Sequence, residues 1–254
     1  MELLDAQFLT WFFLASAVVV ALLDAKQQKR VWSLPLFLAL LSAVYFGQLS
    51  PIGLICLSIG VAGAIAIKHA RQAWVKTVLN VALVIWLIAM AAHVLPGFNN
   101  LLVLKNVYAS PESAPFTLYL NIDKPFIFFI LLVLVPTLVL QAHKSESAID
   151  RALTEQKAIE TSNKSQLLMH PAFRLCILAS LFFVIFTLAL VLGLVKPDVK
   201  IPSWWWIFAL NNLLFTCVAE EAFFRGYIQQ GLINKFGVII AVALTSVLFG
   251  IAHF

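Results

Sequence analysis

Three ionisable side chains lie at the end of a strongly apolar segment. Glu220, Glu221 and Arg225 follow the run Trp204–Ala219, whereas nearly all other charged residues sit between apolar segments. An ionisable group at the depth of a bilayer is costly unless it faces a wet cavity or a partner. Glu221 and Arg225 are four residues apart and can form an ion pair on one helix face, which leaves Glu220 without a local partner.

Glu220 belongs to a polar stripe. Asn212, Thr216 and Glu220 recur every four residues, with Asn211 beside them. On a helix, this spacing places the three side chains on one face. Such a stripe inside an apolar helix is typical of a cavity lining or of a polar contact between helices.

A histidine further along the chain is the best partner for Glu220. The sequence predicts a turn at 235–237, and Glu220 lies 16 residues before Phe236 while His253 lies 16 residues after Gly237. At 1.5 Å per helical residue, both side chains stand roughly 24 Å from the turn. If the two helices form an antiparallel hairpin, the carboxylate and the imidazole reach the same depth.

A carboxylate and an imidazole at one depth can do acid–base chemistry and activate a water molecule. They could also hold a metal ion, but a catalytic zinc usually takes three protein ligands, and only one histidine lies near the glutamates. Spacing alone therefore leaves three interpretations of Glu220 and His253 open. They are catalysis, a structural network that locks helices together, and transport or proton relay.

The composition decides which elements must position these residues. Hydrophobic residues make up 62% and charged residues 11% of the 254 residues, against about 45–50% and about 25% in soluble domains. A soluble enzyme and a disordered chain are thereby excluded, and the continuous apolar runs do not favour a membrane β-barrel. The composition predicts an all-α fold, a polytopic bundle of membrane helices.

We predict eight transmembrane segments. The short segments 34–47 and 52–67 share a break at 47–51 and could be two tilted spans or one helical hairpin that does not fully cross. The eight segments are Phe8–Leu23, Leu34–Gly47, Ile52–Ile67, Thr77–Leu95, Pro125–Leu140, Leu175–Val195, Ser203–Gly226 and Val238–Phe254.

The distribution of Lys and Arg predicts the orientation. Alternate loops hold 13 and 4 of the 17 basic residues, which places the N-terminus and the loop 96–124 outside. This asymmetry also explains the net charge of +5, so we expect no nucleic-acid partner. Within loop 96–124 we expect the apolar piece Phe116–Ile122 on the membrane surface. We expect the inside loop 141–174 to be a partly helical connector.

Two motifs resemble those of a known family. The run Glu220-Glu221-Ala222-Phe223-Phe224-Arg225 matches the E-E-x-x-x-R motif of the CPBP family, the CAAX proteases and bacteriocin-processing enzymes also called Abi. Phe249 to His253 matches the second family motif, F-x-x-x-H. The resemblance covers a protease core at 201–254 and leaves the membrane spans at 1–200 without an assigned function.

The resemblance implies an intramembrane endopeptidase in a bacterial cytoplasmic membrane, in contact with membrane lipid and with a peptide or protein substrate. In such enzymes the residues equivalent to Glu220 and His253 are thought to activate water, which makes Glu221 and Arg225 the supporting pair. Both metal-dependent and metal-free mechanisms are described for the family, so we commit to no cofactor and do not exclude zinc. The residues expected to line the cavity or contact substrate are Asn212, Thr216, Phe224 and Phe249.

Two rival functions and one further motif remain open. The rivals are a non-enzymatic immunity or adaptor protein and a proton-coupled transporter with Glu220 as the relay. The family also has a downstream histidine, followed four residues later by Asn or Asp, that is thought to stabilise the oxyanion. We expect residues 1–254 without it to have little or no peptidase activity. We interpret His93, which Gly97 follows four residues later, as an interfacial or packed histidine.

Overall fold

A computed structural model describes residues 2–24, 29–139, 171–198 and 200–253. Nearly all of the predicted connector at 141–174 lies outside these residues. The chain forms two compact units, one of residues 1–145 and 203–254 and the other of residues 146–202. The described part of the second unit contains helix α8 (Pro171–Val191), whose apolar side chains are largely exposed.

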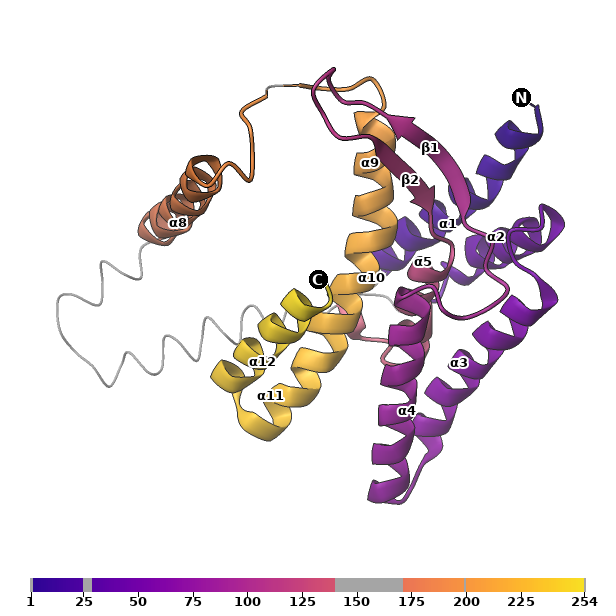
Figure 1. Cartoon of the computed structure of the whole chain (residues 1–254). Coiled ribbons are helices and arrows are strands. Elements are labelled where there is room, and N and C mark those ends of the chain that lie inside the picture. Colours follow the sequence, from indigo (N-terminus) through magenta and orange to yellow (C-terminus); the bar gives the residue numbers. More distant parts are fainter. Residues whose placement is uncertain (1, 25–28, 140–170, 199, 254) are drawn as a thin grey trace, which may run out of the picture. The chain divides into compact units, whose positions relative to one another are not determined.

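The first unit is mostly helical and contains one small sheet (Figure 1). Each segment that the sequence predicts as apolar and membrane-spanning falls on a helix. The elements are α1 (Glu2–Asp24), α2 (Ser33–Tyr45), α3 (Pro51–His69), α4 (Ala73–Ala91), β1 (Leu101–Val107), β2 (Phe116–Leu120), α5 (Asp123–Leu134), α9 (Trp205–Asn211), η1 (Asn212–Cys217), α10 (Val218–Glu220), η2 (Glu221–Gln229), α11 (Gln230–Phe236) and α12 (Val238–Ile251).

The prediction of eight full spans is only partly supported. In the described residues, four helical segments are long and apolar enough to cross a membrane: Gln7–Asp24, Pro51–His69, Ala73–Ala91 and Trp205–Phe236. Helices α2, α5 and α12 have 13, 12 and 14 residues, fewer than the roughly 20 that a membrane span needs. The predicted orientation of the helices stays a prediction.

Helix α5 forms the centre of the first unit. Ten of its twelve residues are buried, and it packs against α3, α4 and the helical stretch from η1 to η2. A helix that is apolar on every side is stable where protein covers all of its surface. The sequence predicts this segment as a span over Pro125–Leu140, but the helix ends at Leu134 and serves as core.

The chain is not all-α, because β1 and β2 pair as an antiparallel hairpin in the predicted outside loop. The apolar piece Phe116–Ile122 supplies strand β2, and its expected place on the membrane surface stays a prediction. Its side chains alternate in exposure, with Leu118 and Leu120 buried and Tyr119 exposed, as expected for a strand with one covered face. The ring of Phe116 stacks on Trp204 at a centroid distance of 5.0 Å, which joins the hairpin to the start of α9.

The helix that carries the glutamates is longer than the sequence predicts. It runs without a break from Trp205 to Phe236 through two π-helical stretches, whereas the prediction ends it at Gly226. A Cβ at Gly226 would lie 2.8 Å from Leu138 Cδ1, so glycine allows the close approach of the segment after α5. The predicted turn at 235–237 is confirmed, because α11 ends at Phe236 and Gly237 has a φ of 78°.

Candidate active site

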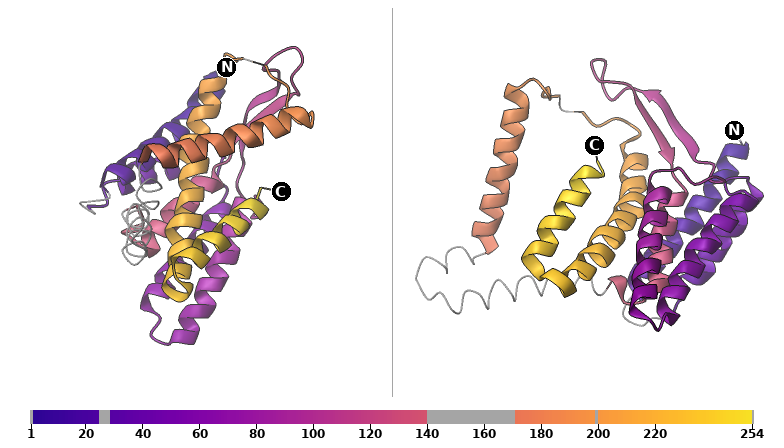
Figure 2. Two further views of the ribbon diagram at one scale, coloured as in Figure 1. Left: turned by 90° about the vertical axis from the view of Figure 1, so that its left-hand side faces the viewer. Right: turned by 60° about the horizontal axis from the view of Figure 1, so that its bottom comes forward.

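Helix α12 packs antiparallel to the η2–α11 stretch (Figure 2). This hairpin brings His253 beside Glu220. Glu220 comes from α10 and His253 follows the last turn of α12. The imidazole Nε2 lies 4.0 Å from the Glu220 Oε2, and the two side chains are 50% and 27% exposed. A gap of this size between two hydrogen-bonding atoms can be closed by one shared water molecule.

The second ring nitrogen of His253 fixes how the ring can act. Its Nδ1 lies 2.8 Å from the carbonyl oxygen of Phe249. Because a carbonyl oxygen can only accept a hydrogen bond, Nδ1 must carry the hydrogen. In the neutral ring, Nε2 is then the unprotonated nitrogen and presents a lone pair toward Glu220. The ring of Phe249 packs against the imidazole at a centroid distance of 4.4 Å.

Glu221 and Arg225 form the ion pair that their spacing predicts. The Arg225 Nε lies 3.3 Å from Glu221 Oε2, and both side chains are more than half exposed. The two π-helical stretches flank Glu220 on either side, since α10 is only the three residues Val218–Glu220. Such widened helical turns are frequent at functional sites.

A cavity of about 170 Å³ adjoins Glu220. It holds the expected residues Phe224 and Phe249, whose rings meet edge to face at 5.1 Å. Three further polar residues, which the motifs do not include, also line it. They are Gln229, Thr245 and Ser246.

Thr245 is the most informative of these three residues. It is 4% exposed, and its Oγ1 has no hydrogen-bond partner among the described residues. A buried hydroxyl without a partner is costly, so a water or a substrate group in the cavity would stabilise it. The sequence contains a signal for Thr245. It is a polar residue in an apolar helix, and it lies eight positions before His253, which at roughly 3.6 residues per turn is about the same helix face.

The polar stripe is divided between two cavities. Asn212 and Thr216 do not line the cavity at Glu220 but a separate one of about 750 Å³. The Asn212 amide donates to the carbonyl oxygen of Phe208 within its own helix, at 3.0 Å. The stripe therefore lines two cavities, with Asn212 and Thr216 at the larger one and Glu220 at the smaller one.

One residue that lines the second cavity, His93, belongs to a histidine–carboxylate pair that no sequence motif indicates. His93 Nδ1 lies 2.6 Å from Asp123 Oδ2, and the Asp123 side chain is 2% exposed. His93 follows the end of α4 and is a partly exposed histidine held by this carboxylate. The charge asymmetry places both the end of α4 and the start of α5 outside, and this shared side could have suggested the pair.

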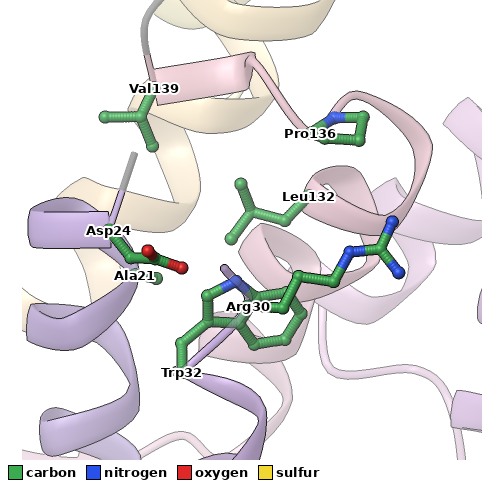
Figure 3. A pocket seen from close by; sticks show the side chains of 7 residues that line it. All are labelled: Ala21, Asp24, Arg30, Trp32, Leu132, Pro136 and Val139. Atoms are coloured by element: carbon green, nitrogen blue, oxygen red, sulfur yellow. The ribbon is translucent and has the colours of Figure 1, made fainter. Parts of the chain in front are cut away.

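A third cavity, of about 110 Å³, lies at the loop after α1 (Figure 3). It contains Asp24 and Arg30, but the guanidinium of Arg30 points away from the Asp24 carboxylate. The carboxylate instead accepts hydrogen bonds from the backbone N–H groups of Lys29 and Val31, at 3.1 and 3.3 Å. Asp24 therefore shapes this loop, and the cavity offers no comparable chemistry.

The donor groups do not fit a zinc site. Across the described part of the chain, no three His, Cys, Asp or Glu side chains are grouped so that they could share a metal ion. Glu220 and His253 supply two donors, and a catalytic zinc usually takes three protein ligands.

The site and the helices define a membrane protein with a glutamate–histidine centre. Residues 202–254 match the family model described as Type II CAAX prenyl endopeptidase Rce1-like. This match confirms the resemblance that the two motifs indicate. No curated protein and no solved structure matches the chain.

Proposed function

We propose that the chain is an intramembrane endopeptidase of the CAAX-protease type that hydrolyses peptide bonds with a water activated by Glu220 and His253. The observation that carries this proposal is the 4.0 Å approach of the His253 Nε2 to the Glu220 carboxylate across the helical hairpin. The match of residues 202–254 supports the same class of reaction.

The two side chains can position one water molecule between them. The water donates one hydrogen bond to Glu220 and one to the Nε2 of His253, which leaves an oxygen lone pair for attack on the peptide carbonyl. As the carbon–oxygen bond forms, Glu220 takes the proton from the water. The protonated carboxyl then donates this proton to the leaving nitrogen when the carbon–nitrogen bond breaks.

The remaining residues have supporting roles in this proposal. Arg225 holds Glu221, so that the second carboxylate is neutralised beside the reacting one. Phe224 and Phe249 form an apolar wall of the cavity. Thr245 also lines this cavity, and its hydroxyl has no hydrogen-bond partner among the described residues, so we assign it as a donor to a substrate carbonyl.

The substrate in this proposal is a peptide or protein segment that reaches the membrane, and the enzyme resides in a bacterial cytoplasmic membrane. The helix that carries Glu220 extends from Trp205 to Phe236. Glu220 is the sixteenth of its 32 residues, so the scissile bond must reach the middle of a membrane-length helix. Such depth favours substrates that are themselves inserted in the bilayer or anchored to it.

Glu220→Gln in the full natural chain, reconstituted in proteoliposomes, tests the proposal. The substrates are random twelve-residue peptides that an N-terminal fatty acyl chain anchors to the bilayer, and mass spectrometry identifies the cleaved bonds. We expect cleavage by the wild type, its loss in Glu220→Gln, and unchanged cleavage in the matched control Glu112→Gln, an exposed carboxylate in the β-hairpin loop. Cleavage that survives Glu220→Gln overturns the assignment of the base.

The rival functions predict other outcomes of the same substitution. For an adaptor or immunity protein, Glu220→Gln leaves partner binding intact, and neither chain cleaves peptides. For a proton-coupled transporter, the substitution abolishes pH-dependent flux into the proteoliposomes. Either outcome, in the absence of peptide cleavage by the wild type, contradicts the peptidase proposal.

A further inference from the structure

The larger cavity, which we call the His93 pocket, has several polar residues in its lining. Its volume of about 750 Å³ is that of a site for a sizeable ligand. It lies between the end of α4, the β-hairpin and the α9–η1 stretch. Its lining residues are His93, Phe98, Asn99, Asn100, Phe116, Thr117, Leu118, Tyr119, Asn121, Lys124, Phe208, Asn211, Asn212 and Thr216.

The pocket lies along one edge of strand β2. Four consecutive residues of this strand, 116–119, line it. Because successive side chains of a strand point to opposite faces, a cavity that touches consecutive residues runs along the strand's edge rather than over one face. The other edge of β2 is paired with β1. Among the described residues no strand pairs with the pocket side of β2, so its backbone groups there are open to an extended chain.

The charged groups of the pocket favour a ligand that carries a carboxylate. Lys124 lines the pocket, and its ammonium has no ion pair in the described ranges. No Asp or Glu is among the described residues that line it. Asp123 itself is buried behind His93 and holds that ring by Nδ1, which leaves Nε2 as the ring nitrogen available to a ligand.

The pocket is also connected to the candidate active site through one helix. Asn211, Asn212 and Thr216 line the pocket, and Glu220 follows Thr216 by four residues. One helical turn is about 5.4 Å, so an extended peptide that leaves the pocket along this helix needs only a few residues to reach Glu220.

We propose that the His93 pocket binds an extended segment of the peptide substrate, which adds as a strand to the free edge of β2 and places a carboxylate against Lys124. The inference rests on the proposed peptidase function. Main-chain hydrogen bonds to a strand edge give affinity without a requirement for one sequence. The carboxylate gives direction to the bound segment. It belongs to an acidic side chain or to the peptide's C-terminus.

A binding experiment in a hydrolytically silent chain separates this inference from the peptidase proposal. The full natural chain with Glu220→Gln is placed in lipid nanodiscs and mixed with random twelve-residue peptides, one library with free C-terminal carboxylates and one with C-terminal amides. Mass spectrometry quantifies the retained peptides. We expect peptides with a carboxylate to be retained at least fivefold more than neutral ones, and this preference to disappear with an added Lys124→Ala.

Two controls make the outcome specific to the pocket. Lys105→Ala removes another lysine of the hairpin, one that does not line the pocket, and should leave the preference unchanged. A retained peptide that is resynthesised with N-methyl groups on alternate residues cannot pair with a strand edge, and it should bind at least tenfold more weakly.

The results decide the inference in each case. A preference confined to the free-acid library assigns the carboxylate to the C-terminus, and one for acidic residues in both libraries assigns it to side chains. The inference is overturned if neither library is retained. It is also overturned if Lys124→Ala leaves the carboxylate preference unchanged, or if the N-methylated peptide binds as tightly as its parent. If carboxylate-dependent retention persists but the wild type cleaves no peptide, the pocket stands and the peptidase proposal fails.

Discussion

Two histidine–carboxylate pairs in the first unit differ in almost every physical respect. His93 and Asp123 approach to 2.6 Å, and the carboxylate is buried. Glu220 and His253 are 4.0 Å apart, and both are partly exposed. The first pair belongs to no motif, whereas the second takes one residue from each of the two motifs. A short contact to a buried carboxylate fixes a structure, while a longer gap beside a cavity leaves room for a reacting molecule.

The comparison indicates that the two pairs contribute to different properties. Removal of a buried partner leaves an uncompensated charge and destabilises the fold. Removal of a partly exposed group costs little stability, because water can solvate the partner that is left. We expect its effect in the rate of the reaction.

The largest effect is expected at Glu220. Replacement with Gln removes the base, and peptide cleavage by the full natural chain should fall by about 10²–10⁴-fold, the usual contribution of general base catalysis. Unfolding by SDS in mixed micelles should be unchanged. If Glu220→Gln instead lowered the free energy of unfolding by several kcal/mol, Glu220 would be a structural group like His93 and Asp123.

The second effect concerns stability. His93→Ala leaves the buried Asp123 carboxylate without its imidazole partner and should lower the free energy of unfolding by about 3 kcal/mol or more. The same SDS titration measures it. His69→Ala, which removes an exposed histidine at the end of α3, is the matched control and should have no effect. If both variants unfold alike, the His93–Asp123 pair does not stabilise the hairpin region.

A smaller loss is expected where a single neutral hydrogen bond joins two helices. The Tyr227 hydroxyl donates to the side-chain oxygen of Asn80 and so links η2 to α4. Tyr227→Phe should cost about 1 kcal/mol in the same titration, and Tyr108→Phe, at an exposed tyrosine of the hairpin loop, should cost nothing. A loss as large as that of His93→Ala would contradict this ranking.

The smallest stability effect is expected for the exposed Glu221–Arg225 pair. Arg225→Ala should change the free energy of unfolding by no more than about 1 kcal/mol, since ion pairs of this exposure contribute little. Peptide cleavage should nevertheless fall, because Glu221 is then unneutralised beside Glu220. Arg71→Ala, at an exposed arginine between α3 and α4, is the control for loss of charge alone. Full activity of Arg225→Ala would remove Arg225 from the supporting pair.

Local sequence determined the features that depend on neighbours along the chain. The apolar runs predicted where helices form, and Gly237 predicted the turn, because its left-handed φ of 78° favours glycine. Equal spacing of Glu220 and His253 from this turn predicted their common depth. A helical hairpin with a short turn converts distance along the sequence directly into height, so no knowledge of other helices was needed.

Only the tertiary structure decided the features that depend on distant segments. Helix α5 resembles a membrane span in composition, and its place at the centre follows from the helices that cover it. His93 and Asp123 are 30 positions apart with a whole hairpin between them, so no local periodicity could have predicted their contact. Hydrophobic periodicity reports which face of an element is apolar, whereas the packing of several elements decides which protein groups cover that face.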